Sequence, residues 1–326
     1  MASADQIKAL LRAYVAGDDP QFLSVANQVA AREAQLGHTK LASELQDLIA
    51  QALARSETHT RSKPIPIAQP KGELTGLLSV SYPKLRLSDM VLPDEMRGRL
   101  ERVIKEQRQA SHIRSYGLSP SRKMLLIGQP GTGKTLSGGV LAGELSLPLF
   151  VVRLEGLITK FMGETAAKLR LVFDSIAHVR GVYLFDEFDS IGSQRGLRND
   201  VGEIRRVLNS FLQFIESDES HSLILAATNH PELLDHALFR RFDDILEFKL
   251  PDTTLTVRLL QTKLSRFTNV QINWDEIARQ TNGMSQAEIV RACESAVKAV
   301  IIADRKVLRD ADVLAAIEER RSSRRG

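Results

Sequence analysis

The residues best suited to chemistry form a glycine-rich run between an apolar segment, 124–127, and a stretch that can continue as a helix. The run has the spacing G-x-x-x-x-G-K-T, which is typical of a phosphate-binding loop between a strand and a helix. Glycine lets the backbone turn so that successive N–H groups converge on a polyphosphate. Lys134 is suited to neutralise the β- and γ-phosphates, and the Thr135 hydroxyl is suited to bind Mg²⁺. We assign these residues to nucleotide binding: Gln129, Pro130, Gly131, Thr132, Gly133, Lys134, Thr135 and Leu136.

Two carboxylates, Asp186 and Glu187, directly follow the apolar run 182–185. If that run is a buried strand, both acids lie at its carboxyl end, where open α/β sheets bind ligands. Asp186 is suited to hold Mg²⁺ directly or through water, and Glu187 is suited to polarise an attacking water. A similar run, 223–226, leads to Asn229 at the same edge, where its amide can orient the water or sense the γ-phosphate. These side chains predict hydrolysis of the bound nucleotide.

Alternating apolar runs and helical stretches must position these residues. The runs 149–152, 182–185, 223–226 and 245–248 are short and rich in apolar or β-branched residues. This alternation predicts an α/β fold with a mostly parallel sheet and helices on both faces. From Pro251 onward the pattern is helical only, which predicts a small helical lid.

The N-terminal part carries three helical patterns and no residue that suggests chemistry. Their apolar stripes, of which the third is Leu41, Leu45, Leu48 and Ala52, can close a small bundle. We expect an adaptor that docks a partner; the alternative is a cover or an oligomer contact. After Ser56 the periodicity disappears, and prolines predict an extended tether. The expected domains are an N-terminal helical bundle at 1–55, a linker at 56–84, a large nucleotide-binding domain at 85–250 and a helical lid at 251–326.

Composition narrows the class of protein. The chain has 326 residues, a net charge of +4 and a single cysteine, Cys293. One cysteine excludes an internal disulfide and suits a reducing compartment. The sequence has no run of about eighteen apolar residues and no signal-peptide pattern, so we expect no membrane span and a cytoplasmic location. We interpret the basic tail at 320–325 as a solvated end rather than a nucleic-acid site.

From about Leu85 to the C-terminus the chain resembles the AAA ATPases. The glycine-rich loop, Asp186-Glu187 and Asn229 match the family's Walker A, Walker B and sensor-1 elements in order and approximate spacing. The closest resemblance is to the group of spastin, katanin and the ESCRT-disassembly ATPases, which likewise have adjacent arginines before a phenylalanine, here Arg240 and Arg241. The resemblance implies Mg²⁺-dependent ATP hydrolysis by a P-loop NTPase αβα sandwich, with a parallel five-stranded sheet and a helical lid. It also implies a homo-oligomeric ring, usually a hexamer, in which both arginines reach a neighbour's nucleotide.

The resemblance also assigns substrate and base contacts. The run Lys160, Phe161, Met162 and Gly163 matches pore loop 1, which in the family grips a threaded polypeptide, and 195–203 corresponds to pore loop 2. A flat aromatic and a flexible methionine can hold many side chains without sequence preference. Met90 and Val91 lie where the family's backbone meets adenine, and Ala287 lies where the ribose is contacted. The chain departs from the family's Gly-Ser-Gly-Ala-Asp-like segment at Met284, Gln286 and Glu288.

Two functions of different class remain. The first is an ATP-driven protein remodeller or unfoldase, with the N-terminal bundle recruiting a target protein and the pore pulling on it. The second is a nucleotide-dependent motor or loader on nucleic acid, which the basic tail permits. Phe161 and Met162 favour the first, because a nucleic-acid channel would present Lys, Arg and stacking aromatics. A scaffold that binds ATP without turnover is disfavoured by Glu187 and the two arginines. The seven histidines form no H-E-x-x-H motif, so proteolysis would need a separate partner protease.

Overall fold

The computed structural model forms two compact units, Met1–Ile65 and Pro66–Gly326. In the second unit it describes residues 72–157, 164–189, 201–234, 236–265 and 272–323, together with Pro70 and Phe267. In the first unit it describes Lys8, 25–26, 29–30, Glu33, His38, 40–45 and 47–48. Side chains at 201–206, 233, 236 and 237 lie outside this description.

In the first unit, the described residues 40–45 and 47–48 are helical, as the third apolar pattern predicts. Their burial differs from that pattern, because Ala42 is buried whereas Leu41 and Leu48 are 46% and 60% exposed. The buried face of this helix therefore carries a small residue, and two leucines of the predicted stripe lie outside it. The first two predicted helices fall largely outside the described residues.

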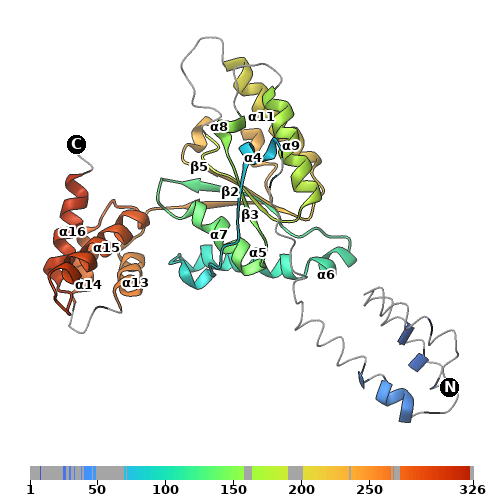
Figure 1. Ribbon diagram of the computed structural model, residues 1–326, viewed down its shortest axis with the longest axis horizontal. Helices are drawn as coiled ribbons and strands as arrows, with labels where there is room; N and C mark the ends of the chain where they lie inside the picture. Colours follow the sequence, from blue (N-terminus) through green and yellow to red (C-terminus); the bar gives the residue numbers. More distant parts are fainter. Residues whose placement is uncertain are drawn as a thin grey trace. The chain divides into compact units, whose positions relative to one another are not determined.

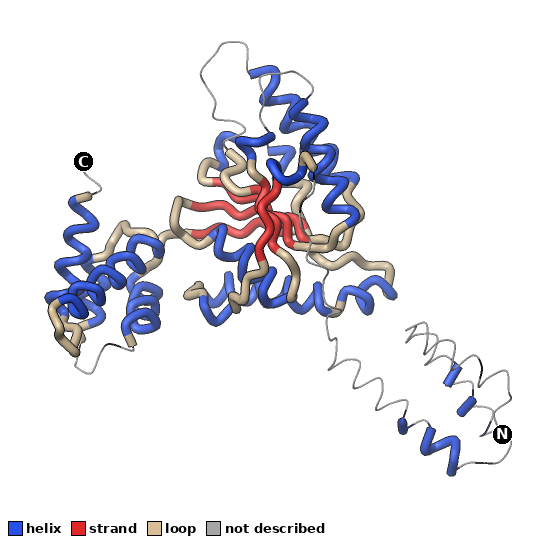
Figure 2. The backbone as a smooth tube through the Cα atoms, in the orientation of Figure 1, coloured by secondary structure: helices blue, strands red, loops and turns tan. Residues whose placement is uncertain are grey.

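A six-stranded sheet forms the centre of the second unit (Figure 2). The strand order is β1-β3-β4-β5-β2-β6, with β1 (Leu78–Ser81), β2 (Lys123–Gly128), β3 (Leu149–Val152), β4 (Val182–Phe185), β5 (Leu223–Thr228) and β6 (Asp244–Phe248). All neighbours from β3 to β6 pair in parallel, with Phe185 opposite Ala226 and Ile127 opposite Thr228. The carboxyl ends of β2, β4 and β5 therefore meet at one edge of the sheet.

The sheet confirms the predicted mostly parallel α/β fold but has six strands where five were expected. The additional strand, β1, is antiparallel to β3, with Leu78 opposite Val152. It lies with helix α4 (Leu74–Leu77) inside 72–84, which the sequence pattern assigned to the linker. Only Leu78 of the four strand residues is buried. Its residues, Leu78-Ser-Val-Ser81, do alternate between apolar and polar, but four residues are at the short limit for such a pattern, so pairing with β3 decides that the segment is a strand.

Helices cover both faces of the sheet (Figure 1). One face carries α5 (Asp94–Arg108), α6 (Ala110–Ser115) and α7 (Lys134–Leu145); the other carries α4, α8 (Leu154–Leu157), α9 (Glu164–His178) and α11 (Val201–Ser217). Short helical turns are η1 (Leu87–Asp89), η2 (Pro231–Leu233) and α12 (His236–Phe239). Alternate residues of β4 point to opposite faces: Tyr183 and Phe185 pack in the core with α9 and α11, whereas Leu184 lies near Gly138 of α7. This alternation explains why the strand is apolar throughout.

The predicted lid contains α13 (Thr253–Leu264), α14 (Trp274–Gln280), α15 (Gln286–Ile302) and α16 (Asp310–Ser322). A reciprocal capping box starts α15, in which Ser285 Oγ accepts from the Glu288 N–H and the Glu288 carboxylate accepts from the Ser285 N–H at 2.7 Å. Cys293 is buried in the lid core, and burial raises the pKa of its thiol to about 12. The single cysteine is therefore a packing residue. None of the described helices, in the lid or elsewhere, is long and apolar enough to cross a membrane.

Helix α7 packs closely against the segment before η1, and its glycines permit this approach. A Cβ atom on Gly143 would overlap the Leu85 carbonyl oxygen and come within 3.0 Å of the Leu85 nitrogen. A Cβ atom on Gly138, in the same helix, would meet only leucine side chains at 3.4 Å or more. The two glycines therefore form a matched pair for mutation.

We expect Gly143→Ala to lower the free energy of unfolding by about 1–3 kcal/mol, because the added methyl group must displace backbone. The control, Gly138→Ala, should stay within about 1 kcal/mol of wild type, since better helix propensity offsets a mild side-chain adjustment. Chemical denaturation measures both values. Equal stabilities for the two variants would contradict this packing role of Gly143.

Candidate active site

The glycine-rich loop joins β2 to α7, as the sequence predicts. β2 ends at Gly128, and α7 begins at Lys134. Gly131 and Gly133 have φ values of 77° and 108°, which side chains other than glycine rarely adopt. The loop leads directly into the N-terminus of a 12-residue helix. This arrangement favours binding of a phosphate group, because unpaired N–H groups and the helix dipole act on the same anion.

Lys134 is the charged centre of the site, although its side chain is only 6% exposed. Its Nζ donates to the carbonyl oxygens of Gly128 at 2.6 Å and Gln129 at 3.0 Å, and to Oδ1 of Asn229 at 2.8 Å. Burial lowers the pKa of Lys134, and nearby carboxylates, Asp186 first among them, oppose that shift. The ammonium is thus desolvated but well hydrogen-bonded. A polyphosphate at the loop would compete with these oxygens for it.

The remaining loop residues divide by exposure. Thr132 is buried, and its Oγ1 donates to the Gln129 carbonyl at 2.8 Å, which braces the turn from within. The exposed residues of the predicted set are Gln129, Pro130, Gly131, Thr135 and Leu136. The structure therefore leaves most of the loop surface open to a ligand.

Thr135 and Asp186, the two residues predicted to bind Mg²⁺, lie side by side. The Thr135 hydroxyl donates to Asp186 Oδ2 at 2.7 Å, so the first turn of α7 and the end of β4 contribute adjacent oxygens. Mg²⁺ prefers oxygen ligands and usually takes only one or two from protein, with phosphates and water completing its shell. The described residues contain no group of three or more His, Cys, Asp or Glu that could hold a metal alone. The two oxygens fit Mg²⁺, which when bound neutralises charge on phosphate oxygens.

Glu187 has a strained backbone between fixed neighbours. Its φ is 50°, in the left-handed region, and its N–H donates to Asp186 Oδ1 at 3.0 Å. The next residue, Phe188, is fully buried, and its N–H donates to the Ala227 carbonyl at 2.8 Å. Strain of this kind concentrates at functional sites. The turn leaves the Glu187 carboxylate exposed to solvent, where it can polarise a water molecule.

Asp189 belongs to the site although motif matching does not predict it. Its side chain is 7% exposed, and Oδ1 accepts the Asn229 N–H at 3.1 Å. Asn229 in turn accepts a hydrogen bond from Lys134, so Asp189 positions the amide that contacts the ammonium. The sequence signal is a third acid directly after Asp186-Glu187-Phe188. Its importance comes from burial, which that pattern does not reveal.

The lid docks on the phosphate loop and on the predicted base contacts. The Ala287 N–H donates to the Gly131 carbonyl at 2.9 Å, and a Cβ atom on Gly131 would come within 2.7 Å of Ser285 Oγ. Gln286 Nε2 donates to the Val91 carbonyl at 3.2 Å. Gly131 therefore permits close packing of the lid as well as the turn of the loop. Gln286, at a position where the chain departs from the family pattern, bridges the lid to Val91.

The predicted adenine contacts lie beneath the loop and against the lid. Met90 is 2% exposed, and Ser137 Oγ lies 3.9 Å from its sulfur. A Cβ atom on Gly133 would meet the Met90 methyl group at 3.4 Å. Val91 is buried in the lid core. The structure thus brings Met90 and Ala287 beside the loop and Val91 beside the lid, and their contacts with adenine and ribose stay predictions.

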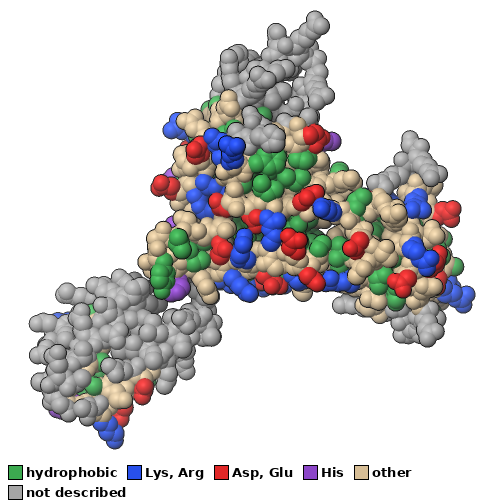
Figure 3. All heavy atoms as spheres, turned by 180° about the vertical axis from the view of Figure 1, so that it is seen from behind, with side chains coloured by type: hydrophobic (Ala, Val, Ile, Leu, Met, Phe, Trp, Pro, Cys, Tyr) green, Lys and Arg blue, Asp and Glu red, His purple; other side chains and the backbone are tan. Residues whose placement is uncertain are grey.

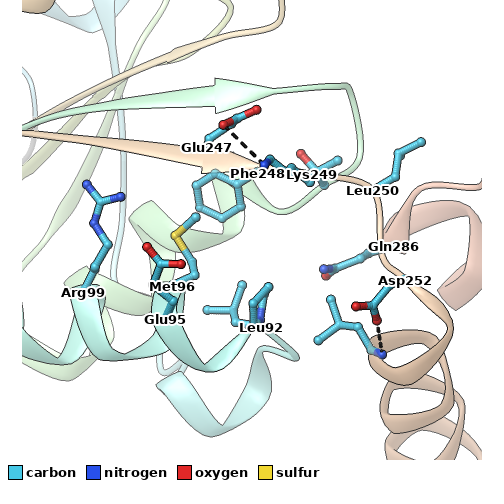
Figure 4. A pocket seen from close by; sticks show the side chains of 13 residues that line it. Leu92, Glu95, Met96, Arg99, Glu247, Phe248, Lys249, Leu250, Asp252 and Gln286 are labelled. Carbon is cyan, nitrogen blue, oxygen red and sulfur yellow. Dashed lines mark hydrogen bonds and ion pairs between the residues drawn. The ribbon is translucent and has the colours of Figure 1, made fainter.

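A pocket of about 390 Å³ lies between the start of α5, the end of β6 and the lid (Figure 4). Its lining combines apolar and charged side chains, including Leu92, Glu95, Met96, Arg99, Phe248, Asp252, Leu255 and Gln286. Of the predicted nucleotide-binding residues, Thr132 alone is among those that line it. The pocket is therefore at the junction of the α/β part and the lid, and it does not contain the acidic pair.

Arg240 and Arg241 follow α12 on a surface turn and stand apart from the Lys134 network. Arg240 is exposed, whereas the Arg241 side chain is 31% exposed and its Nε donates to Glu216 Oε2 at 3.1 Å. The hydrogen bonds of Lys134 and Asn229 include neither arginine. The structure therefore assembles the loop, both acids and Asn229 at one edge, and places the arginines elsewhere.

The predicted substrate contacts lie outside the described residues. These are Lys160, Phe161, Met162 and Gly163 of pore loop 1, together with positions 195–200 of pore loop 2. Their roles stay predictions.

Comparisons with known proteins agree with this geometry. The sequence model of a family described as ATPase family associated with various cellular activities (AAA) matches residues 124–250, which contain the loop, both acids and Asn229. A protein of Sinorhizobium fredii (strain NBRC 101917 / NGR234), described as uncharacterized AAA family ATPase y4kL, is 35% identical over 328 residues, which cover 100% of this chain and 98% of that protein. This chain belongs to the AAA ATPase family. It is an ATPase that uses ATP and Mg²⁺.

Two further relatives of this AAA ATPase are longer proteins. ATP-dependent zinc metalloprotease FtsH 1 of Methylacidiphilum infernorum (isolate V4) is 34% identical over 242 residues, which cover 71% of this chain and 38% of that protein. Meiotic spindle formation protein mei-1 of Caenorhabditis elegans is 35% identical over 208 residues, which cover 61% of this chain and 44% of that protein. The chain therefore matches less than half the length of either relative.

We expect Asp189→Ala to slow ATP hydrolysis about ten- to hundredfold, because the Asn229 backbone N–H loses its buried carboxylate acceptor. Asp189→Asn should retain most activity, since its amide oxygen can accept the same N–H. Asp174→Ala, which removes an exposed acid on α9, is the matched control and should behave as wild type. Steady-state ATPase rates test this. A normal rate for Asp189→Ala would show that Asn229 needs no such support.

Proposed function

We propose that this AAA ATPase forms a homo-oligomeric ring, a hexamer, and uses ATP hydrolysis to pull a polypeptide through a central pore. The observation that supports this best is that the residues suited to hydrolysis lie apart from Arg240. A hydrolytic set is assembled at one sheet edge, whereas exposed Arg240 belongs to a different surface. Residues in the expected roles are Lys134 for the phosphates, Thr135 and Asp186 for Mg²⁺, and Glu187 for the attacking water.

Catalysis across a subunit interface explains why an arginine lies away from the loop. Hydrolysis develops negative charge on the transferred phosphoryl group, and an arginine finger supplied by a neighbour can contribute about 10³–10⁵ in rate. The turn with Arg240 lies between Leu238 and Phe242, which are both buried. A fixed backbone of this kind suits a residue that must meet another subunit with defined geometry.

A protein substrate fits the relatives and the predicted pore loop. The FtsH 1 relative is described as an ATP-dependent zinc metalloprotease, an enzyme that acts on proteins. Phe161 and Met162 would supply the grip on substrate, with Lys160 and Gly163 beside them. The chain has no H-E-x-x-H motif, so we propose that it remodels its target, with any proteolysis left to a partner.

Nucleic acid is the less favoured substrate. A nucleic-acid motor would concentrate Lys and Arg into a continuous basic stripe. Over the face of the α/β part in Figure 3, basic and acidic side chains are interleaved. The net charge of the chain is only +4. These distributions support a protein substrate more than a phosphate backbone.

The first unit, Met1–Ile65, is proposed as the adaptor that recruits the target. Its exposed Leu41 and Leu48 offer apolar contact to a partner. We place the protein in the cytoplasm, because its single cysteine is a buried packing residue and calls for no oxidising compartment.

Two variants test whether the ring grips protein. Glu187→Gln keeps the shape of the side chain but loses its basicity, so it should bind ATP, hydrolyse it slowly and hold target proteins bound. Adding Phe161→Ala should release those proteins without weakening ATP binding, because the sequence assigns Phe161 to the substrate and not to the phosphates. Phe161→Tyr, which retains an aromatic ring, is the matched control and should keep them. Affinity capture followed by mass spectrometry provides the measurement. Equal capture by all three forms would exclude Phe161 as a substrate contact.

A further inference from the structure

The turn that carries Arg240 and Arg241 is fixed on both sides. Leu238 before it and Phe242 after it are 1% and 8% exposed and belong to the core of the α/β part. The Asp243 carboxylate then accepts two backbone N–H groups near the start of β2, at 2.8 and 2.9 Å. The backbone of this turn is therefore held in place, and the directions in which Arg240 and Arg241 leave it are fixed.

The two arginines have different electrostatic surroundings. Arg241 donates from Nε to Glu216 at 3.1 Å. Glu216 lies in the last turn of α11, which has no basic residue of its own, so Arg241 also brings a positive charge to the negative end of the helix dipole. Arg240 is exposed, and within the described part of the chain its side chain makes no hydrogen bond or ion pair. One arginine is therefore held by its own subunit, and the other is available.

We propose that Glu216 is a positioning residue that keeps Arg241 within its own subunit, so that Arg240 alone reaches the nucleotide of the neighbouring subunit. The inference rests on the proposed ring with catalysis across its interfaces. It narrows the sequence-based expectation that both arginines cross the interface. The sequence pattern assigns no role to Glu216.

The energetic reason is the cost of moving each side chain. Arg241 would have to break its pair with Glu216 and leave the end of α11 in order to contact a neighbour's phosphate. Arg240 gives up only water. Two adjacent guanidinium groups also repel each other, and Glu216 offsets one of those charges while the other extends. Because arginine stays protonated in proteins, the position of each guanidinium decides its role.

The first test compares kcat and KM for ATP in rings whose assembly is verified by analytical ultracentrifugation. Arg240→Ala should lower kcat by about 10³–10⁵-fold. Glu216→Gln and Arg241→Ala should each lower kcat by only about two- to fivefold, the scale of an exposed ion pair. KM should not change, because a displaced finger affects the transition state and not ATP binding. Glu219→Gln removes a nearby exposed acid of the same type and is the matched control, with wild-type kinetics expected.

The deciding variant exchanges the two charges, as Glu216→Arg together with Arg241→Glu. If Glu216 acts by holding Arg241, the exchange should return kcat to within about twofold of wild type, whereas Arg241→Glu alone stays impaired. No recovery in assembled rings, or a loss for Arg241→Ala as large as that for Arg240→Ala, would overturn the inference. If the exchanged protein does not assemble, Glu216→Gln decides, because an unchanged kcat there excludes a positioning role.

A separate mixture tests the ring on which the inference rests. Inactive Arg240→Ala subunits mixed with inactive Lys134→Ala subunits should regain hydrolysis, since some interfaces will pair an intact nucleotide site with an intact Arg240. Mixed rings that form but stay inactive would overturn catalysis across the interface, whatever the charge exchange shows. Recovery in the mixture with failure of the charge exchange would leave the ring intact and refute only the role of Glu216.

Discussion

Burial of the Lys134 ammonium is the constraint on which the site depends. A buried charge is tolerated only when its hydrogen bonds are satisfied. Its acceptors are the carbonyl oxygens of Gly128 and Gln129, at the carboxyl end of β2, and Oδ1 of Asn229, at the carboxyl end of β5. They can meet only because β2 and β5 are neighbours in the sheet. Asp189 fixes the Asn229 backbone, so the strand order, the ammonium and a buried carboxylate support one another. The strand order is therefore as much a condition of the site as the loop sequence.

The lid is part of the same assembly, because it contacts the loop at a glycine. Gly131 accepts the Ala287 N–H, and its lack of a side chain leaves room for Ser285. Gln286 adds a second contact, to the Val91 carbonyl. A ligand at the loop and the position of the lid are consequently linked through a few backbone atoms. Through such a link, ATP hydrolysis at the loop can change the position of the lid.

Much of the site could be predicted because its signals are local. The loop spacing and the acids after 182–185 each depend on residues close together in the chain. Local spacing determines which backbone N–H groups, carboxylates or hydroxyls can come together within one turn or strand end. The parallel sheet followed from the same reasoning, since helical stretches between apolar runs leave few alternatives to parallel pairing. The sequence by itself thus determined the chemistry of the site and the class of the fold.

Tertiary structure decided what depends on partners distant in sequence. β1 is a strand because β3 pairs with it, and its four residues are too few for their apolar and polar alternation to decide the matter alone. Asp189 acts on the site because it is buried beside Asn229. Its place after Asp186 and Glu187 in the sequence does not indicate that it is buried. Arg241 differs from Arg240 because α11 brings Glu216 to one of them. In each case the deciding contact joins segments that are distant in the sequence and become neighbours only when the chain folds. A local sequence pattern therefore cannot predict that contact.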